Sequence, residues 1–223
     1  MMFAIFSVKG GSGTSVVAAS ISQLLARHTA TVLIDLAGDL PTILGRNDGA
    51  APGTHDWLNA GDDVPVDSLR RLEIELAPGF SMMTMGGALD PIGGGRGRIL
   101  ACVLAADPRT MVVDCGLATT LVAQETLRIA SHRIVVIRGC YTAIKKLVGT
   151  ATRPDGIVLI AEPGRALGRK EIEHATGLPV VCEIPFDAAI SRTVDAGLLA
   201  CRTPSQLSKP LERWLVSLTG VAA

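Results

Sequence analysis

The fold of this chain is decided by the stretch Val8-Lys9-Gly10-Gly11-Ser12-Gly13-Thr14-Ser15. An apolar run over residues 3–8 leads into it, and a segment with helical periodicity over residues 15–27 follows it. Glycines let the backbone turn tightly and approach a ligand closely, so that N–H groups and the positive end of a helix can point at an anion. A strand, a glycine-rich turn and a helix start in this order predict a phosphate cradle.

The cradle departs at one position from the usual P-loop pattern. That pattern places a lysine just before the Ser or Thr that holds magnesium, and here the position is Thr14. A charge-assisted hydrogen bond contributes about 1.5–3 kcal/mol, so its loss predicts nucleotide binding that is roughly ten- to a hundredfold weaker but not abolished. Hydrolysis suffers more, because removing a preorganised donor from a transition state typically costs about 10²–10³ in rate.

Composition predicts one globular domain over residues 1–223. Of the 223 residues 48% are hydrophobic, and Lys+Arg and Asp+Glu both number 21. The balanced charge gives no overall field for a polyanion or an anionic membrane, so nucleic-acid binding would need a local basic patch. Five scattered cysteines without a C-x-x-C pair favour a reducing cytoplasm over a cysteine metal site. No apolar run approaches the roughly 20 residues of a membrane span, so we expect a cytoplasmic protein.

Strand and helix patterns alternate along the chain. Strands are predicted over 3–8, 31–35, 80–85, 110–114, 133–137, 156–161 and 179–184, and helices over 15–27, 99–106, 121–130, 141–148, 169–176 and 208–218. Residues 37–65 are rich in Gly, Pro, Asp and Asn and predict mostly loop, with a short helix near Trp57. The alternation predicts an α/β fold, a doubly wound and mostly parallel sheet with helices on both faces.

Two of the predicted strands end in aspartate, at Asp35 and Asp114. In open α/β sheets the ligand binds at the carboxyl ends of the strands, where the cradle also lies. A carboxylate there can reach a magnesium ion that bridges phosphate oxygens. Taken singly, each aspartate is equally explained as a helix N-cap or a turn residue. Together with the cradle, they favour a nucleotide site.

Four segments resemble the MinD/ParA group of P-loop ATPases. Lys9-Gly10-Gly11-x-Gly13-x-Ser15 matches the deviant Walker A loop of this group except at Thr14, where the group has its phosphate-binding lysine. Residues 32–36 are similar to its second-strand aspartate motif, residues 112–114 to its Walker B strand, and residues 184–187 through Gly197 to its closing proline-loop segment. The resemblance covers nearly the whole chain in order.

The resemblance implies ATP or ADP with Mg²⁺ as cofactors and a homodimer as the working form. Ser15 would ligate the magnesium ion, Asp114 would hold it through water, and Asp35 would lie near it. Lys9 would be the signature lysine that reaches the partner's nucleotide. The implied cofactor-binding loop consists of Lys9, Gly10, Gly11, Ser12, Gly13, Thr14 and Ser15.

Two positions depart from the family pattern in ways that bear on turnover. The water-activating carboxylate of the family falls at Ala37, with Asp39 nearby but displaced. The asparagine that often reads adenine is not evident in residues 159–163. The resemblance thus predicts a nucleotide-binding switch in septum placement, DNA partition or pilus assembly in a bacterial cell, with weak or absent ATP hydrolysis and a protein partner that the sequence does not identify.

Two alternatives belong to other functional classes. A nucleotide-free scaffold that keeps the fold only for protein contacts would have much the same sequence. A short-chain-dehydrogenase-like NAD(P) oxidoreductase is suggested by Gly11-x-Gly13 with Asp35 downstream and by the spacing Tyr141-x-x-x-Lys145. The third glycine of the dinucleotide fingerprint is replaced by Val16, which makes this the minor alternative.

The remaining motifs are weaker. Arg96 and Arg98, in the glycine-rich segment 93–98, suit an anion, but a flexible linker is favoured. The four histidines show no metal-ligand spacing, and with aromatics at 3% base-stacking platforms are scarce. For the last helix, packing on the sheet is favoured over contact with a membrane surface. Its apolar stripe consists of Leu207, Leu211, Trp214, Leu215 and Leu218.

Overall fold

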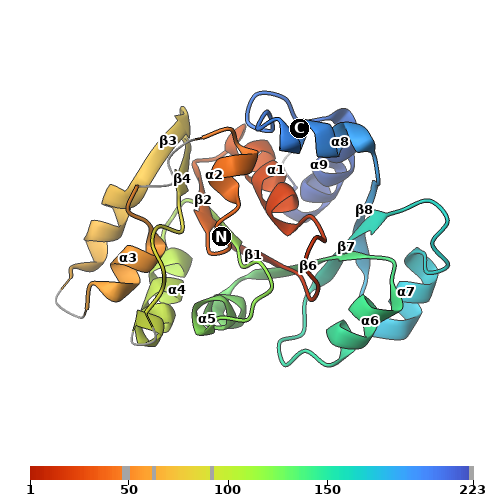
Figure 1. The fold of residues 1–223 in the computed structure, drawn as a ribbon, viewed down its shortest axis with the longest axis horizontal. Helices are drawn as coiled ribbons and strands as arrows, with labels where there is room; N and C mark the ends of the chain where they lie inside the picture. The colour runs from red at the N-terminus through yellow and green to blue at the C-terminus, as the bar shows by residue number, and fades with distance from the viewer. Residues whose placement is uncertain (47–50, 62–63, 91–92, 221–223) are drawn as a thin grey trace.

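An eight-stranded sheet forms the centre of the molecule (Figure 1). The computed structural model describes residues 1–46, 51–61, 64–90 and 93–220. The strand order is β3-β4-β2-β5-β1-β6-β7-β8, and every neighbouring pair is parallel except β3 with β4. This confirms the predicted doubly wound, mostly parallel sheet. The strands are β1 Met2–Phe6, β2 Thr31–Asp35, β3 Glu73–Ala77, β4 Phe80–Met83, β5 Thr110–Asp114, β6 His132–Arg138, β7 Gly156–Ala161 and β8 Val180–Pro185.

Helices cover both faces of the sheet (Figure 1). One face is covered by α3 Thr54–Asn59, α4 Gly97–Ala106, α5 Leu121–Ile129, α6 Tyr141–Val148 and α7 Arg169–Thr176. The opposite face is covered by α1 Thr14–Ala26, α2 Leu40–Ile43, α8 Ala188–Asp195 and α9 Ser205–Thr219. Short 3₁₀ helices at Val66–Leu72 and Gly93–Arg96 complete the described elements.

Strand alternation divides the core between these two layers. In β1, Ala4 and Phe6 face the α4 side, whereas Phe3 and Ile5 face α1. Because both faces of a parallel sheet are covered, the central strands are apolar throughout. Each fully buried large side chain contributes about 1.5–3 kcal/mol relative to an exposed one. This packing fixes the edge at which the strands end in Asp35 and Asp114.

The last helix packs on the sheet, as the sequence favoured. It begins at Ser205, three residues before the predicted start, and includes Pro210. Leu207, Leu211 and Trp214 are buried against α1 and β8, whereas Leu218 is partly exposed. Within the described ranges, none of the helices combines the length and the apolar character that a membrane crossing requires.

The glycine-rich segment 93–98 is not the flexible linker that the sequence favoured. It forms a 3₁₀ turn that runs into α4, and Arg96 is only 6% exposed. The Arg96 guanidinium lies 3.9 Å from the Trp57 ring centroid and donates hydrogen bonds to the carbonyls of Trp57 and Gly61. These contacts tie Arg96 to α3 and Gly61, while its Nε is buried without a partner among the described residues.

Candidate functional site

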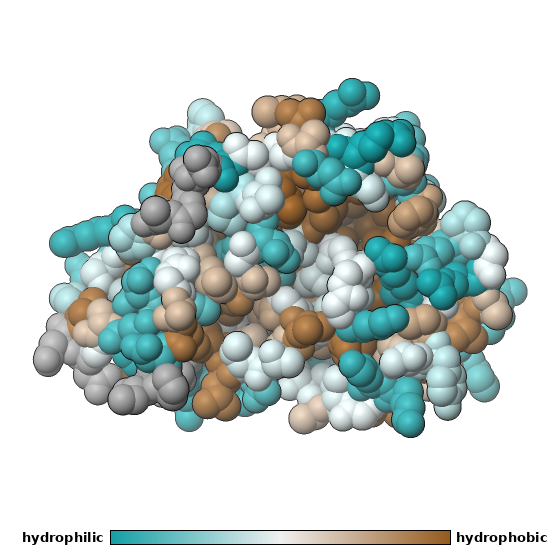
Figure 2. Space-filling view, viewed as in Figure 1, coloured by the Kyte–Doolittle hydropathy of each residue, from teal (hydrophilic) through white to brown (hydrophobic). Residues whose placement is uncertain are grey.

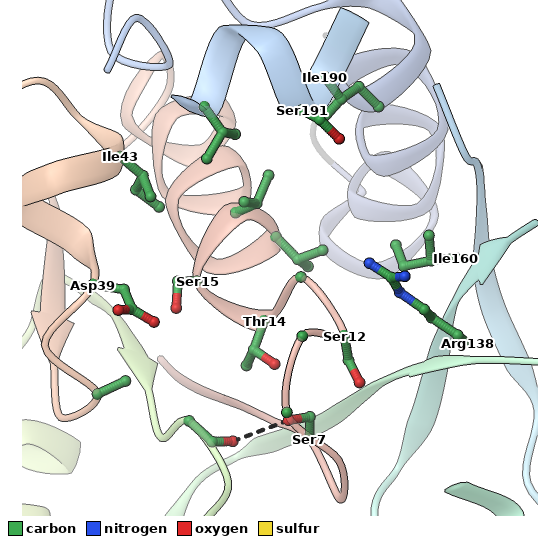
Figure 3. Close-up of a pocket in the computed structure, with 18 of the residues that line it drawn as sticks. Ser7, Ser12, Thr14, Ser15, Asp39, Ile43, Arg138, Ile160, Ile190 and Ser191 are labelled. Carbon is green, nitrogen blue, oxygen red and sulfur yellow. Dashed lines mark hydrogen bonds between the residues drawn. The ribbon is translucent and has the colours of Figure 1, made fainter. Parts of the chain in front are cut away.

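A cavity of about 810 Å³ opens where the central strands end (Figure 3). Its floor is the glycine-rich loop and the start of α1, and α8 lies over it. In the space-filling view, apolar side chains surround the hollow below α8 (Figure 2). The apolar part of its wall includes Val16, Ile43, Ile160, Ile184, Phe186 and Ile190. A volume in this range suits a small-molecule ligand with one polar and one apolar end.

The loop presents backbone amides to this cavity. Gly11 and Gly13 have φ angles of 71° and 90°, in the left-handed region that favours glycine. Gly13 is the N-cap of α1 and supplies no side-chain cap, and the first turn of the helix contains no acidic residue. The first N–H groups of α1 therefore keep their capacity to bind an anion, and the helix dipole adds to it. The Ser12 hydroxyl closes the turn by donating to the Lys9 carbonyl at 2.6 Å.

Positive charge is scarce in the cavity. Thr14 is 7% exposed and lines the cavity where the P-loop pattern has a lysine (Figure 3). Lys9 is exposed and lies outside the lining, with its Nζ 4.0 Å from the Cys140 sulfur at the start of α6. Of the described residues that line the cavity, only Arg138 carries a positive charge. Arg138, which the sequence reasoning did not select, comes from the carboxyl end of β6.

Asp114 has a buried oxygen without a partner. Its Oδ1 accepts a hydrogen bond from the Gly116 N–H at 3.1 Å, whereas its Oδ2 has no donor among the described residues. Burial raises the pKa of Asp114 to about 7, and the Ser15 hydroxyl and the Gly116 N–H lower that pKa in part. A buried acceptor without a donor is costly, so a cation or a bound water would be favourable here.

The residues present fit a magnesium ion that is held mainly by phosphate and water. No cluster of three or more His, Cys, Asp or Glu in the described ranges is arranged to hold a metal ion. Ser15 and the unpartnered oxygen of Asp114 are oxygen donors of the kind that Mg²⁺ prefers, and Mg²⁺ commonly keeps several waters beside substrate phosphates. Such an ion would thus depend on a bound nucleotide.

Asp35, at the end of the neighbouring strand β2, has different hydrogen-bond partners from Asp114. Its Oδ1 accepts from the N–H groups of Ala37 at 2.8 Å and Gly38 at 2.6 Å, and its Oδ2 accepts from Leu40 at 3.1 Å. Burial raises its pKa, and these three N–H groups oppose the rise. Asp35 does not line the cavity. Its carboxylate shapes the turn into α2, and the proximity to a metal that the resemblance implies stays a prediction.

Ala37 and Asp39 both line the cavity on the side of α2. The methyl group of Ala37 stands where the family resemblance places a water-activating carboxylate. Asp39 is exposed, and Figure 3 shows its carboxylate turned toward the Ser15 hydroxyl. Asp39 therefore borders the same part of the cavity as Ala37, although it is displaced by two positions in the sequence.

The dehydrogenase alternative receives no support from the geometry. Tyr141 is 74% exposed at the start of α6, and neither Tyr141 nor Lys145 lines the cavity. Strand β1 pairs with β5 and β6, whereas dinucleotide-binding folds place the first two strands side by side in the order 3-2-1-4-5-6. The spacing of Tyr141 and Lys145 is thus unrelated to the cavity.

Comparisons with known proteins identify the fold. No protein-family model matches the chain, and no curated protein matches it significantly in sequence. A ParA family ATPase from Chlorobium tepidum TLS superposes with a TM-score of 0.78 at 21% identity, with 98% of each chain covered. The septum site-determining protein MinD from Pyrococcus horikoshii OT3, complexed with Mg-ADP, gives 0.76 at 17% identity, covering 98% of this chain and 95% of that one.

A third solved structure, an ATP complex of McdA from Cyanothece, gives a TM-score of 0.74 at 16% identity, with 100% of this chain and 97% of that chain covered. At these identities the likeness is one of fold. The chain has the fold of the ParA/MinD ATPases over its whole described length.

Proposed function

We propose that this chain binds ATP or ADP with Mg²⁺ in the cavity at the start of α1 and acts as a nucleotide-dependent switch. The observation that carries the proposal is the uncapped start of α1 behind two left-handed glycines, opening into a cavity of about 810 Å³. Backbone N–H groups at a helix start are a ready anion site. In this proposal the amides from Gly10 to Ser15 hold the phosphates.

The magnesium ion would be held by Ser15 directly and by Asp114 through water. When bound, it neutralises charge on the phosphate oxygens. The buried Oδ2 of Asp114, which has no donor in the described ranges, supports this assignment, because it would gain a partner when a hydrated cation arrives. Asp35 is already satisfied by three N–H groups, so its contribution is to hold the turn that carries Ala37 and Asp39.

Hydrolysis is proposed to be weak or absent. The Thr14 position offers no ammonium group to the developing charge, and Ala37 offers no carboxylate to orient water. Electrostatic stabilisation of the transition state is usually the largest contribution to such a reaction, so its loss affects turnover more than binding. Nucleotide occupancy, rather than turnover, would set the state of the switch.

The biological role follows the solved structures of similar fold, whose names include a septum site-determining protein, and so belongs to this proposal. We infer a part in spatial organisation of a bacterial cell, in septum placement, DNA partition or pilus assembly, through a nucleotide-dependent homodimer in the cytoplasm. Lys9, exposed beside the cavity, would reach the nucleotide of the second copy. The buried stripe of α9 argues against a membrane anchor formed by that helix.

Calorimetric titration tests the proposal. Mg-ATP and Mg-ADP should bind, NADH should not, and light scattering should show a larger species with Mg-ATP than without it. Binding of NADH alone would favour the oxidoreductase instead. Failure of all three ligands would leave the nucleotide-free scaffold, for which the missing cation at Thr14 is the supporting observation.

A further inference from the structure

We propose that Arg138 supplies the phosphates of the bound nucleotide with the positive charge that the loop lacks at Thr14. This inference rests on the proposed function and names the residue that would replace the missing lysine. Among the described residues that line the cavity, Arg138 has the only positively charged side chain.

Strand register brings Arg138 to the level of the cradle. Phe6 of β1 pairs with Val135 of β6, so Lys9 and Arg138 each lie three residues beyond a paired position. Neighbouring strands are about 4.8 Å apart, so β6 ends beside the end of β1, from which the loop starts. Arg138 and the loop residues from Gly10 to Ser15 line the same cavity.

Strand alternation sends Arg138 to the correct face. Ile134 and Val136 of β6 pack in the layer that contains α1, and successive side chains in a strand alternate. Arg138 therefore projects to the face from which α1 starts. Figure 3 shows its guanidinium pointing into the cavity near Ile160.

The guanidinium retains donors for a ligand. One terminal nitrogen donates to Glu162 Oε1 at 2.7 Å, whereas Nε is buried and has no partner among the described residues. Guanidinium has five N–H donors in a planar fork that matches phosphate oxygens. Contact with a phosphate would satisfy a donor that is now buried without an acceptor.

Glu162 allows Arg138 to turn toward a ligand at low cost. Its side chain is 14% exposed and pairs with both Arg138 and Arg165. The Arg165 and Arg138 guanidinium groups hold the pKa of Glu162 below its usual range. Because Arg165 remains in place, Glu162 keeps a cationic partner when Arg138 binds a phosphate, and no buried carboxylate is left unpaired.

A different contact for Arg138 is stacking on the base. Its Cζ lies 5.8 Å from the Phe186 ring centroid, so a flat ring could enter the same region. The two contacts differ in the ligands that would report them. If Arg138 contacts phosphate, its substitution lowers the affinity for tripolyphosphate, which has no base. If Arg138 stacks on the base, its substitution lowers the affinity for adenosine, which has no phosphate.

The experiment titrates ATP, sodium tripolyphosphate and adenosine into the wild type, Arg138→Ala and a matched control, Arg133→Ala. Arg133 lies on the same strand and also pairs with a carboxylate, Asp155 at 2.6 Å, but it does not line the cavity. Arg138→Ala should weaken ATP and tripolyphosphate binding by about ten- to a hundredfold. Arg133→Ala should change neither affinity, and Thr14→Lys combined with Arg138→Ala should restore ATP binding.

Each other outcome overturns the inference. Unchanged ATP affinity in Arg138→Ala, or loss of adenosine affinity with tripolyphosphate unaffected, removes the phosphate contact while leaving the proposed nucleotide site in place. A wild-type protein that binds neither ATP nor tripolyphosphate removes the proposed function itself. Melting curves monitor folding, and Arg138→Gln, which keeps most of the side-chain stem, replaces Arg138→Ala if that variant does not fold.

Discussion

Asp35 and Asp114 stand side by side at the ends of β2 and β5, yet they have different surroundings. They are paired in the strand register, and both are completely buried. Asp35 accepts three backbone hydrogen bonds, whereas Asp114 accepts one from the backbone, and its Oδ2 has no hydrogen-bond partner within the described part of the chain. Neither carboxylate lines the cavity. The same pattern, an apolar strand that ends in aspartate, thus yields one carboxylate whose two oxygens are both hydrogen-bonded and one whose Oδ2 has no partner among the described residues.

The chain after each aspartate explains the difference. Beyond Asp35 the backbone turns back over the carboxylate through Gly38, whose φ is 90°, and continues into α2. Beyond Asp114 it leaves through Gly116, whose φ is 54°, and only one N–H points back. An acceptor left open in a buried place costs stability, and such costs are common at functional sites.

The largest effect should come from Asp35→Asn. The amide keeps one acceptor oxygen but turns an NH₂ group toward a backbone N–H, and it loses the charge that strengthens the remaining bonds. An unsatisfied buried donor costs about 1–3 kcal/mol, so we expect the free energy of unfolding to fall by about 3 kcal/mol. Urea denaturation at pH 8 measures this loss.

The neighbouring Asp39→Asn is the control for Asp35→Asn. Asp39 is exposed and caps no helix through its side chain, so its substitution should change the free energy of unfolding by less than about 0.5 kcal/mol. Equal losses in the two variants would show that the three hydrogen bonds to Asp35 contribute little, and the contrast between the two strand ends would then fail.

Asp114→Asn should have the opposite sign. Burial raises the pKa of Asp114 from 3.8 to about 7, so the folded state binds a proton that the unfolded state has lost between these two pH values. The cost of the ionised carboxylate is absent below pH 3.8, grows as the pH rises, and is complete above about pH 7. Three pKa units correspond to an upper bound of about 4 kcal/mol, and we expect a gain of about 2 kcal/mol in the variant at pH 8.

Denaturation of Asp114→Asn and the wild type at pH 5 and pH 8, with a chelator present, measures this gain. The difference between the two proteins should be larger at pH 8. A difference that is independent of pH would mean that Asp114 is not the group responsible, and a loss of stability at both pH values would place Asp114 with Asp35 as a structural carboxylate.

Thr14→Lys tests whether the loop beside these strand ends binds phosphate more tightly once it carries a cation. Thr14 begins the helix that carries Ser15, and its side chain borders the cavity, so a lysine there has space to extend toward a phosphate. We expect ATP to bind at least about tenfold more tightly, as a charge-assisted hydrogen bond would give. Isothermal titration with Mg-ATP provides the measurement. Unchanged affinity would count against the proposed cradle.

The sequence predicted the elements that carry the cradle because each has a strong pattern. These elements are the loop 8–15 and the two strands that end in aspartate, and the alternation of strands and helices also predicted the doubly wound sheet. It did not predict β3, an edge strand with little buried surface, or α8, which has no fully buried residue and so no clear apolar stripe. A periodic pattern of apolar residues indicates which side chains are buried, and β3 and α8 bury few side chains.

The roles of Asp35, Asp114 and Arg138 could not be predicted from the sequence, because they depend on tertiary contacts. Whether Asp35 or Asp114 is the satisfied carboxylate depends on how each following loop closes, and both loops contain a glycine with positive φ. The pairing of Arg138 with Glu162 joins residues 24 apart through the register of β6 and β7. No local pattern encodes that register, so Arg138 became visible only in the folded chain.

The smallest effect should follow Ser15→Ala. The Ser15 hydroxyl lowers the pKa of Asp114 in part and would ligate the magnesium ion, so its loss should weaken Mg-ATP binding by roughly two- to tenfold. Binding of ATP in a chelator should be unchanged, because the backbone amides remain. Ser20→Ala is the matched control: its hydroxyl lies on the same helix, donates to the Val16 carbonyl at 2.8 Å and does not line the cavity. Equal weakening with and without Mg²⁺ would mean that Ser15 contacts the phosphates and not the magnesium ion. The difference between the ends of β5 and β2 would then rest on the hydrogen bonding of Asp114 alone.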